Sequence, residues 1–116
     1  MRVGIADHLG WAGAVPAAAD HVVVDRRRIE LVEPGTPVMP VHHDGQALDD
    51  DGMAALIASV RASSEHATTR VLDELERSLP APVASMALRI SPDEFPTDVA
   101  TLRAAPWDSR ADAAMY

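Results

Sequence analysis

The sequence predicts an α/β fold in which three strands form an antiparallel meander and precede a long helix, a fourth strand and carboxy-terminal helices. Four apolar, β-compatible runs predict the strands, at residues 3–6, 11–15, 21–32 and 83–90. Apolar residues recur at three- and four-residue steps from Met53 to Leu79, which predicts the helix. With 116 residues, 47% of them apolar, the chain can form one modest core, so we expect a single domain over residues 1–116.

The first two predicted strands meet at a short polar turn. Residues 3–6 are apolar and are followed by Asp7 and His8, and Gly10 lies in the turn before the second strand. We expect Pro16 to end that second strand. Ligands commonly bind where a buried strand ends, so Asp7 and His8 are the first candidate site. The alternative is a turn aspartate that accepts hydrogen bonds from nearby backbone amides.

The third predicted strand carries a run of arginines. Val22 and Val24 share one strand parity whereas Ile29 and Leu31 share the other, which predicts a bulge between them, near residues 26–28. Consecutive arginines could bind an anionic partner, but nearby acidic residues can neutralise them. We interpret these arginines as solvated charge on an edge strand, which prevents pairing with other sheets.

The long helix has recognisable start and stop signals. Three aspartates at residues 49–51 supply acidic side chains to the first turn, and Pro80 prevents the helix from continuing. Residues 63–66 are the least apolar part of the helix, so we expect any kink there. Residues 33–46 precede the helix and contain three prolines and two glycines, which predicts an irregular loop.

The remainder of the chain predicts one more strand and two short helices. Residues 83–90 are almost continuously apolar, which is typical of a central strand buried on both faces. Thr97 is the expected cap of a short helix, and Asp108 or Ser109 is the expected cap of a last helix that reaches Tyr116. Because this last helix stops soon after it is capped, we hypothesise that the chain ends before its natural terminus.

The opening hairpin carries a recognisable pattern. An aspartate ends the first strand in Gly4-Ile5-Ala6-Asp7, and a glycine, an aromatic and a small residue begin the second in Gly10-Trp11-Ala12. This hairpin and the order of elements resemble the ribonuclease H-like superfamily, including RuvC-type nucleases and their actin-like relatives. The resemblance implies that the fourth strand lies parallel to the first, and that the final strand and helix of that fold are missing here.

The same resemblance implies a two-metal phosphodiesterase mechanism, in which clustered carboxylates hold Mg²⁺ or Mn²⁺. Asp7 would be the first catalytic ligand. The second acid of that family lies near the end of strand four, where this chain has Arg89 ahead of Asp93. Asp112, four residues after Asp108 on the last predicted helix, would serve as a later catalytic acid. A noncatalytic member of the superfamily would fit the sequence equally well.

A second group of candidate ligands lies in the loop before the long helix. His42, His43 and Asp44 carry side chains that can bind zinc or a similar ion. Adjacent side chains of an extended segment point in opposite directions, so such a site also needs Asp7, His8 or His21. Asp7, His8 and residues 42–44 are the predicted metal ligands. The alternative interpretation of residues 42–44 is a solvated polar loop.

The composition excludes several classes of function. There are no cysteines, which excludes thiol chemistry, and all ten basic residues are arginine, which excludes a lysine Schiff base. A formal charge of −8 disfavours nucleic acid as a general partner. No apolar stretch approaches the roughly 18 residues that span a bilayer, so we expect no membrane segment and a cytoplasmic protein.

Two functions remain as expectations from the sequence. The first is divalent-metal-dependent hydrolysis of phosphoesters, such as those of nucleic acids, at Asp7. The second is a noncatalytic protein interaction module that forms homo-oligomers through apolar surface left exposed by the missing elements.

Overall fold

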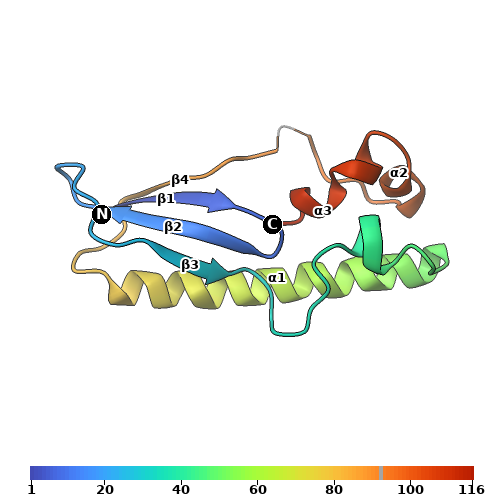
Figure 1. The fold of residues 1–116 in the computed structure, drawn as a ribbon, viewed down its shortest axis with the longest axis horizontal. Helices are drawn as coiled ribbons and strands as arrows, with labels where there is room; N and C mark the ends of the chain where they lie inside the picture. Colours follow the sequence, from blue (N-terminus) through green and yellow to red (C-terminus); the bar gives the residue numbers. More distant parts are fainter. Residues whose placement is uncertain (92) are drawn as a thin grey trace.

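The computed structural model describes residues 1–91 and 93–116 and contains one mixed sheet, one long helix and several short helical segments (Figure 1). The strands are β1 (Arg2–Asp7), β2 (Trp11–Ala17), β3 (Arg27–Glu30) and β4 (Ser85–Ala87). The helical segments are the π-helix η1 (Pro40–Asp44), α1 (Asp50–Ser78), α2 (Val99–Arg103), the 3₁₀ helix η2 (Trp107–Ser109) and α3 (Ala111–Ala114). The predicted α/β fold class is confirmed.

The strands lie in the order β3-β2-β1-β4. The first three strands pair antiparallel, as a meander predicts, whereas β4 lies parallel to β1. Pro16 does not end β2, as we expected, but lies within it, opposite Val3. Proline has no amide hydrogen to donate. The carbonyl oxygen of Pro16 instead accepts a hydrogen bond from the Val24 N–H (3.0 Å) in the neighbouring segment.

The third strand is shorter than predicted, because the chain turns before it reaches β3. Val22 and Val23 are exposed, and Val23 pairs with Ala17 of β2 only through an isolated antiparallel bridge. His21 adopts the left-handed conformation (φ 67°), and the Val22 N–H donates to Asp20 Oδ1 (3.1 Å). A break therefore replaces the expected bulge. β3 itself is an edge strand, as the arginine run predicts.

α1 confirms the predicted long helix at both ends. The Gly52 N–H donates to Asp49 Oδ1 (2.7 Å), so Asp49 is the N-cap, and the helix ends before the prolines that follow it. α1 continues as one helix through residues 63–66, where any kink was expected. Ser63 Oγ in this stretch accepts a hydrogen bond from the Glu33 N–H (2.8 Å). This polar group therefore attaches the preceding loop to the helix instead of disturbing the helix backbone.

Two clusters of buried apolar residues lie along α1. The first lies between the sheet and the carboxy-terminal part of α1 and consists of Val3, Ala12, Ala14, Ile29, Leu31 and Leu75. The second lies between the amino-terminal part of α1 and the short helices and consists of Val41, Met53, Ile57, Leu102, Trp107 and Ala111. The molecule is elongated, with extents of 51 × 27 × 18 Å. We call the two parts the sheet half and the helical half.

β4 differs most from its prediction. Only residues 85–87 of the predicted strand pair with β1, and they do so at the edge of the sheet rather than at its centre. The side chains of Met86, Leu88 and Ile90 are 40%, 55% and 77% exposed. The apolar run predicted burial on both faces. Instead, α1 packs against side chains of β1, β2 and the β3 segment. Among the described residues, no strand pairs with the outer side of β4.

The carboxy-terminal helices are capped differently from our expectation. Asp98, not Thr97, caps α2, since it accepts hydrogen bonds from the Thr101 hydroxyl (2.8 Å) and N–H (3.0 Å). These two bonds lower the pKa of the Asp98 carboxyl, the hydroxyl contributing most. Asp108 lies in η2 and does not cap α3, which begins after Arg110 without a side-chain cap. Across residues 1–91 and 93–116, no helix combines the length and apolar character needed to cross a membrane.

Candidate functional site

Asp7 lies at the carboxyl end of β1, on the wall of a cleft of about 290 Å³ that we call the Asp7 cleft. Its side chain is 17% exposed, and its Oδ2 lies 3.3 Å from Nη2 of Arg89, in the segment that follows β4. The opposite wall comes from η2, α3 and the carboxy terminus, which lies beside the tips of β1 and β2 (Figure 1). Three segments far apart in the sequence therefore meet at this candidate residue.

The charged side chains that line the Asp7 cleft are Arg89, Arg110 and Asp7, and each arginine is paired with a carboxylate. The Arg110 guanidinium lies over the Trp107 ring, 4.4 Å from its centroid, and its Nη2 lies 3.0 Å from Asp93 Oδ2. The acid that the ribonuclease H-like resemblance implies near the end of strand four is replaced here by an arginine that neutralises Asp7.

His8 takes part in a different contact from its neighbour Asp7. Its ring stacks on Trp11, with ring centroids 4.0 Å apart and an interplanar angle of 11°. The Arg28 guanidinium also lies over the Trp11 ring, 4.3 Å from the centroid. The structure therefore places Asp7 in the cleft and His8 in an exposed aromatic and cationic stack.

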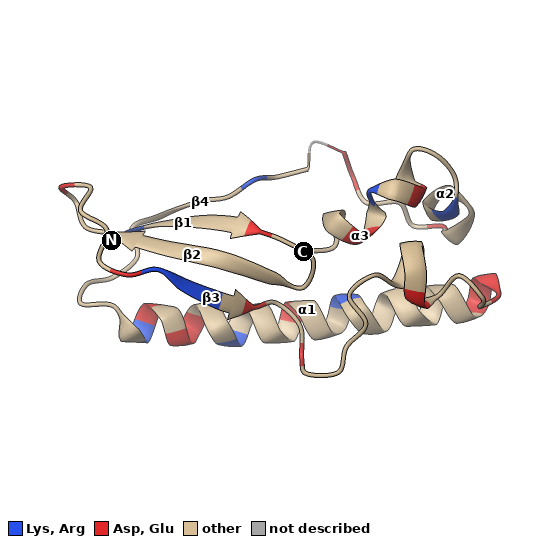
Figure 2. Ribbon diagram, in the orientation of Figure 1, with Lys and Arg blue, Asp and Glu red and all other residues tan. Residues whose placement is uncertain are grey.

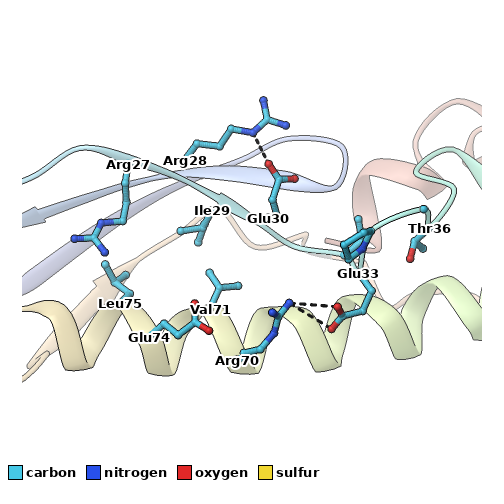
Figure 3. Close-up of a pocket in the computed structure, with 13 residues that line it drawn as sticks. Arg27, Arg28, Ile29, Glu30, Glu33, Thr36, Arg70, Val71, Glu74 and Leu75 are labelled. Atoms are coloured by element: carbon cyan, nitrogen blue, oxygen red, sulfur yellow. Dashed lines mark hydrogen bonds and ion pairs between the residues drawn. The ribbon is translucent and has the colours of Figure 1, made fainter.

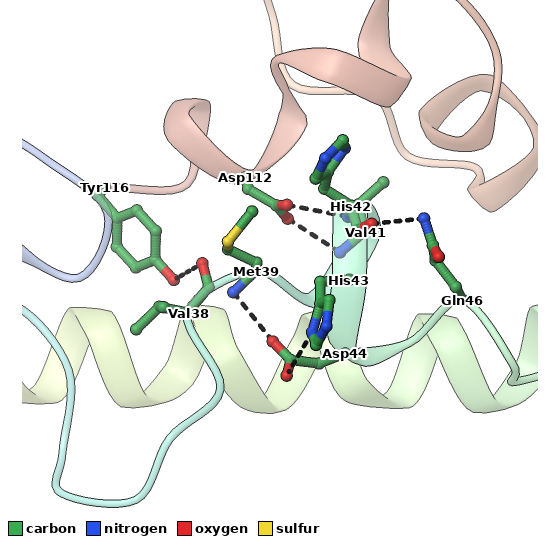
Figure 4. Close-up of polar contacts among 9 residues, drawn as sticks. All are labelled: Val38, Met39, Val41, His42, His43, Asp44, Gln46, Asp112 and Tyr116. Atoms are coloured by element: carbon green, nitrogen blue, oxygen red, sulfur yellow. Dashed lines mark hydrogen bonds and ion pairs between the residues drawn. The ribbon is translucent and has the colours of Figure 1, made fainter.

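Asp112 is buried, with 6% of its surface exposed, and it binds the beginning of η1 (Figure 4). Its Oδ1 accepts a hydrogen bond from the Val41 N–H and its Oδ2 accepts one from the His42 N–H, both at 2.9 Å. These amides belong to the first turn of η1, which has no side-chain cap of its own, so Asp112 satisfies them across the chain. The predicted catalytic acid thus joins α3 to η1 and does not line the Asp7 cleft.

The predicted ligands at residues 42–44 lie in η1, which occupies part of the expected irregular loop. His43 Nδ1 lies 3.5 Å from Asp44 Oδ1, and Asp44 Oδ2 accepts a hydrogen bond from the Met39 N–H (3.1 Å) (Figure 4). His42 lines a separate cleft of about 460 Å³ together with Asp108. The hydrogen bond from Met39 makes Asp44 part of the local structure of this turn.

A divalent metal ion would require the candidate ligand side chains to lie close together. Within residues 1–91 and 93–116, no three or more histidine, aspartate or glutamate side chains gather closely enough to hold a metal ion. Asp7, His8 and residues 42–44 are therefore not assembled into one group of ligands. A two-metal site needs several convergent carboxylates, whereas Asp7 has an arginine as its ionic partner.

Tyr116 lines the Asp7 cleft and contacts the segment that precedes η1 (Figure 4). Its hydroxyl donates a hydrogen bond to the Val38 carbonyl oxygen (2.8 Å). Burial raises the pKa of the Tyr116 hydroxyl to about 12, and the negative charges of Asp112 and Asp44 add to this effect. The tyrosine is therefore a neutral hydrogen-bond donor at neutral pH.

A cleft of about 700 Å³ lies between β3 and α1 (Figure 3). Its charged residues are three arginines and three glutamates. The Arg28 Nε–Glu30 Oε1 distance is 2.6 Å and the Arg70 Nη2–Glu33 Oε2 distance is 3.3 Å, while Arg27 pairs with Asp25. Acidic and basic residues also alternate along the adjoining part of α1 (Figure 2). This local pairing supports the interpretation of the arginine run as solvated edge-strand charge.

From the sequence we selected Asp7 as a candidate but did not select the residues that line the cleft with it. Arg110, Trp107 and Tyr116 form the wall opposite Asp7, although they lie about a hundred positions further along the chain. Nothing local in the sequence marks them as neighbours of β1. The one available signal was the concentration of aromatic residues in a short carboxy-terminal segment, which is typical of a packed surface.

Comparison with known proteins assigns no family. No protein-family model matches this chain, and neither the curated proteins nor the solved structures provide a match. The classification that stands is therefore structural: a mixed four-stranded sheet in the order β3-β2-β1-β4, with β4 parallel to β1, and a long helix.

Proposed function

We propose that this chain is a noncatalytic interaction module that forms homo-oligomers through the free edge of β4. The observation that carries the proposal is the exposure of three large apolar side chains on and beside an edge strand: Met86, Leu88 and Ile90. Exposed apolar surface that is continuous with an unpaired strand edge is typical of a protein interface.

The spacing of these side chains fits strand addition. They recur at two-residue steps, which is the spacing of one face of a strand, and Met86 is in register with the buried Val3 of β1. A second β4 that pairs antiparallel with the first would satisfy the free backbone groups of both strands and cover both apolar rows. Such an interface is isologous and closes as a symmetric dimer.

The charge of the two sheet edges also favours β4 as the interface. The opposite edge, β3, carries Arg27, Arg28 and Glu30, and charged side chains of this kind prevent edge-to-edge pairing. Residues 83–91, by contrast, contain a single charged residue, Arg89. The sheet is thus protected at one edge and open at the other.

Sedimentation equilibrium over a range of protein concentrations tests this proposal. We expect a reversible dimer, and we expect Leu88→Arg to raise its dissociation constant at least about tenfold, equivalent to about 1.4 kcal/mol. Val22→Arg is the matched control, because Val22 is 57% exposed and Leu88 55%, but Val22 lies between β2 and β3 whereas Leu88 directly follows β4. A wild-type chain that remains monomeric at all concentrations, or an equal effect of both variants, would rule out the β4 interface.

A second candidate function is divalent-metal-dependent phosphoester hydrolysis by a ribonuclease H-like core. It is favoured by the position of Asp7 at the carboxyl end of β1, beside a parallel β4, in a sheet of the order β3-β2-β1-β4. Against it stands the pairing of Asp7 with Arg89 in place of a second acid. We rank it second for that reason.

Calorimetric titration with Mg²⁺, Mn²⁺ and Zn²⁺ tests the second candidate. If Asp7 is a metal ligand, the wild type binds one of these ions and Asp7→Asn loses that binding. Asp108→Asn is the control, because Asp108 is exposed and lies outside the Asp7 cleft. Absence of binding by the wild type would eliminate the metal-dependent function.

A further inference from the structure

We infer that the Asp7 cleft binds a phosphate monoester of a small organic molecule, held between Arg89 and Arg110. The inference concerns a cleft within one chain, which shares Ile90 with the apolar row proposed for the β4 interface. It differs from the metal-dependent candidate, since the groups that would bind the phosphate are guanidinium groups rather than carboxylates.

The position of the cleft is one at which ligands bind in sheets with parallel strands. β1 and β4 are parallel neighbours. Asp7 is the last residue of β1, and Arg89 lies two residues after the carboxyl end of β4. Ligands of α/β proteins bind in the crevice beyond such ends. A volume of about 290 Å³ is near the lower limit for a ligand pocket, which restricts the occupant to a small molecule.

Two guanidinium groups line the cleft and can donate to an anion, although each is paired with one carboxylate and the chain as a whole carries −8. Each guanidinium has five N–H donors, and the contacts with acidic side chains occupy few of them. Arg89 is held by Asp7 at 3.3 Å, and Arg110 is held by Asp93 at 3.0 Å and by the face of Trp107. Both cations are thus positioned at the cleft with donors remaining for a ligand.

The arrangement of donors favours phosphate over carboxylate. A carboxylate has two oxygens and matches one planar guanidinium fork, whereas a phosphate monoester has three terminal oxygens and can bridge two forks from opposite walls. Arg89 lies on the wall after β4 and Arg110 on the wall before α3. Ser91 lies on the same lining, and its hydroxyl donates a hydrogen bond to the Asp93 carbonyl oxygen (3.4 Å).

The remaining lining is apolar and accommodates the organic part of the ester. Trp107 and Tyr116 contribute aromatic surface, and Ala113 and Ala114 leave space beside them. An aryl or alkyl group attached to the phosphate would contact this wall. Phenyl phosphate is therefore a suitable probe, with inorganic phosphate as the probe of the anionic part alone.

Isothermal titration calorimetry in a buffer that contains a chelator measures binding, and Trp107 fluorescence in a Trp11→Phe background locates the ligand. We expect phenyl phosphate to bind more tightly than inorganic phosphate and to change the emission of Trp107. Arg89→Gln and Arg110→Gln should each weaken binding about tenfold or more. Arg77→Gln, which removes the same charge from the exposed surface of α1, should leave affinity unchanged.

Asp7→Asn separates this inference from the metal-dependent function. It removes the carboxylate that competes for Arg89, so phenyl phosphate should bind several-fold more tightly, whereas a metal-dependent site would lose its ligand. Circular dichroism checks that each variant remains folded. The inference is overturned if the wild type shows no saturable binding, if Trp107 emission is unchanged on binding, or if Arg77→Gln weakens binding as much as Arg89→Gln.

Discussion

The sheet half and the helical half of this molecule are held together by different interactions. In the sheet half, apolar side chains from β1, β2, the β3 segment and α1 pack around Leu75. In the helical half, the apolar cluster around Trp107 is accompanied by a buried carboxylate, Asp112, that fixes η1 through two main-chain amides. One half therefore depends mainly on packing and the other also on a specific polar contact.

This difference has consequences for function. Packing by α1 covers one part of the sheet and leaves the β4 edge exposed, which is the surface we propose for association. The polar contact of Asp112 holds α3 against η1, and α3 forms a wall of the Asp7 cleft. The sheet half supplies an open surface, and the helical half completes a cleft. Four measurements test this comparison, in order of decreasing effect on stability.

Replacement of Asp112 should have the largest effect. In Asp112→Ala, the amides of Val41 and His42 lose a charged acceptor, and we expect the free energy of unfolding to fall by about 3–5 kcal/mol. Urea denaturation measures the loss. Asp108→Ala, an exposed aspartate on the preceding turn, is the control and should change stability by less than about 0.5 kcal/mol. Equal effects would show that the polar contact does not stabilise the helical half.

Truncation of Leu75 should have the next largest effect. Leu75 is 2% exposed in the core of the sheet half, and Leu75→Ala should cost about 3 kcal/mol through lost burial and a residual cavity. Hydrogen exchange followed by NMR should show loss of protection in β1 and β2 before η1. Loss of protection in both halves to the same extent would contradict the distinction between them.

Removal of Asp49, the N-cap of α1, should lower the stability of both halves by a smaller amount. Asp49→Ala eliminates the acceptor of the Gly52 N–H, and we expect a loss of about 1 kcal/mol. Because α1 contributes to both apolar clusters, thermal unfolding should remain a single transition with a lower midpoint. Asp51→Ala, which removes an acidic residue from the same turn without removing the cap, is the control.

Ionisation of Tyr116 should have the smallest effect, confined to alkaline pH. Its pKa is raised to about 12 in the folded state, against about 10 in the unfolded chain. The contribution to stability is therefore fully present below pH 10 and is lost as the pH rises from 10 to 12. After allowance for solvent screening we expect a loss on the order of 1 kcal/mol.

Absorbance at 295 nm follows this ionisation directly, because tyrosinate absorbs there and Tyr116 is the one tyrosine of the chain. The midpoint should lie near pH 12 in the native protein and near pH 10 in denaturant. Tyr116→Phe should remove this part of the pH dependence. A native midpoint near 10 would show that the hydroxyl is not held against η1.

Local signals in the sequence determined α1, the β1–β2 hairpin and the order of elements. The helical period from Met53 to Leu79 and the cap at Asp49 depend on residues within one or two turns of each other, so they can be recognised from the chain alone. The hairpin likewise follows from two short apolar runs and the glycine between them. These are the predictions that the structure confirms.

Tertiary structure alone decided the environment of β4, the contact of Asp112 and the composition of the Asp7 cleft. An apolar run specifies a strand but not its place in the sheet, and β4 is exposed because its neighbours are chosen by packing across the molecule. An acidic residue on a helix reads as solvated, yet Asp112 is buried because amides 70 or 71 positions away require an acceptor. Burial and charge pairing depend on which distant segments meet, and no local pattern in the chain encodes that.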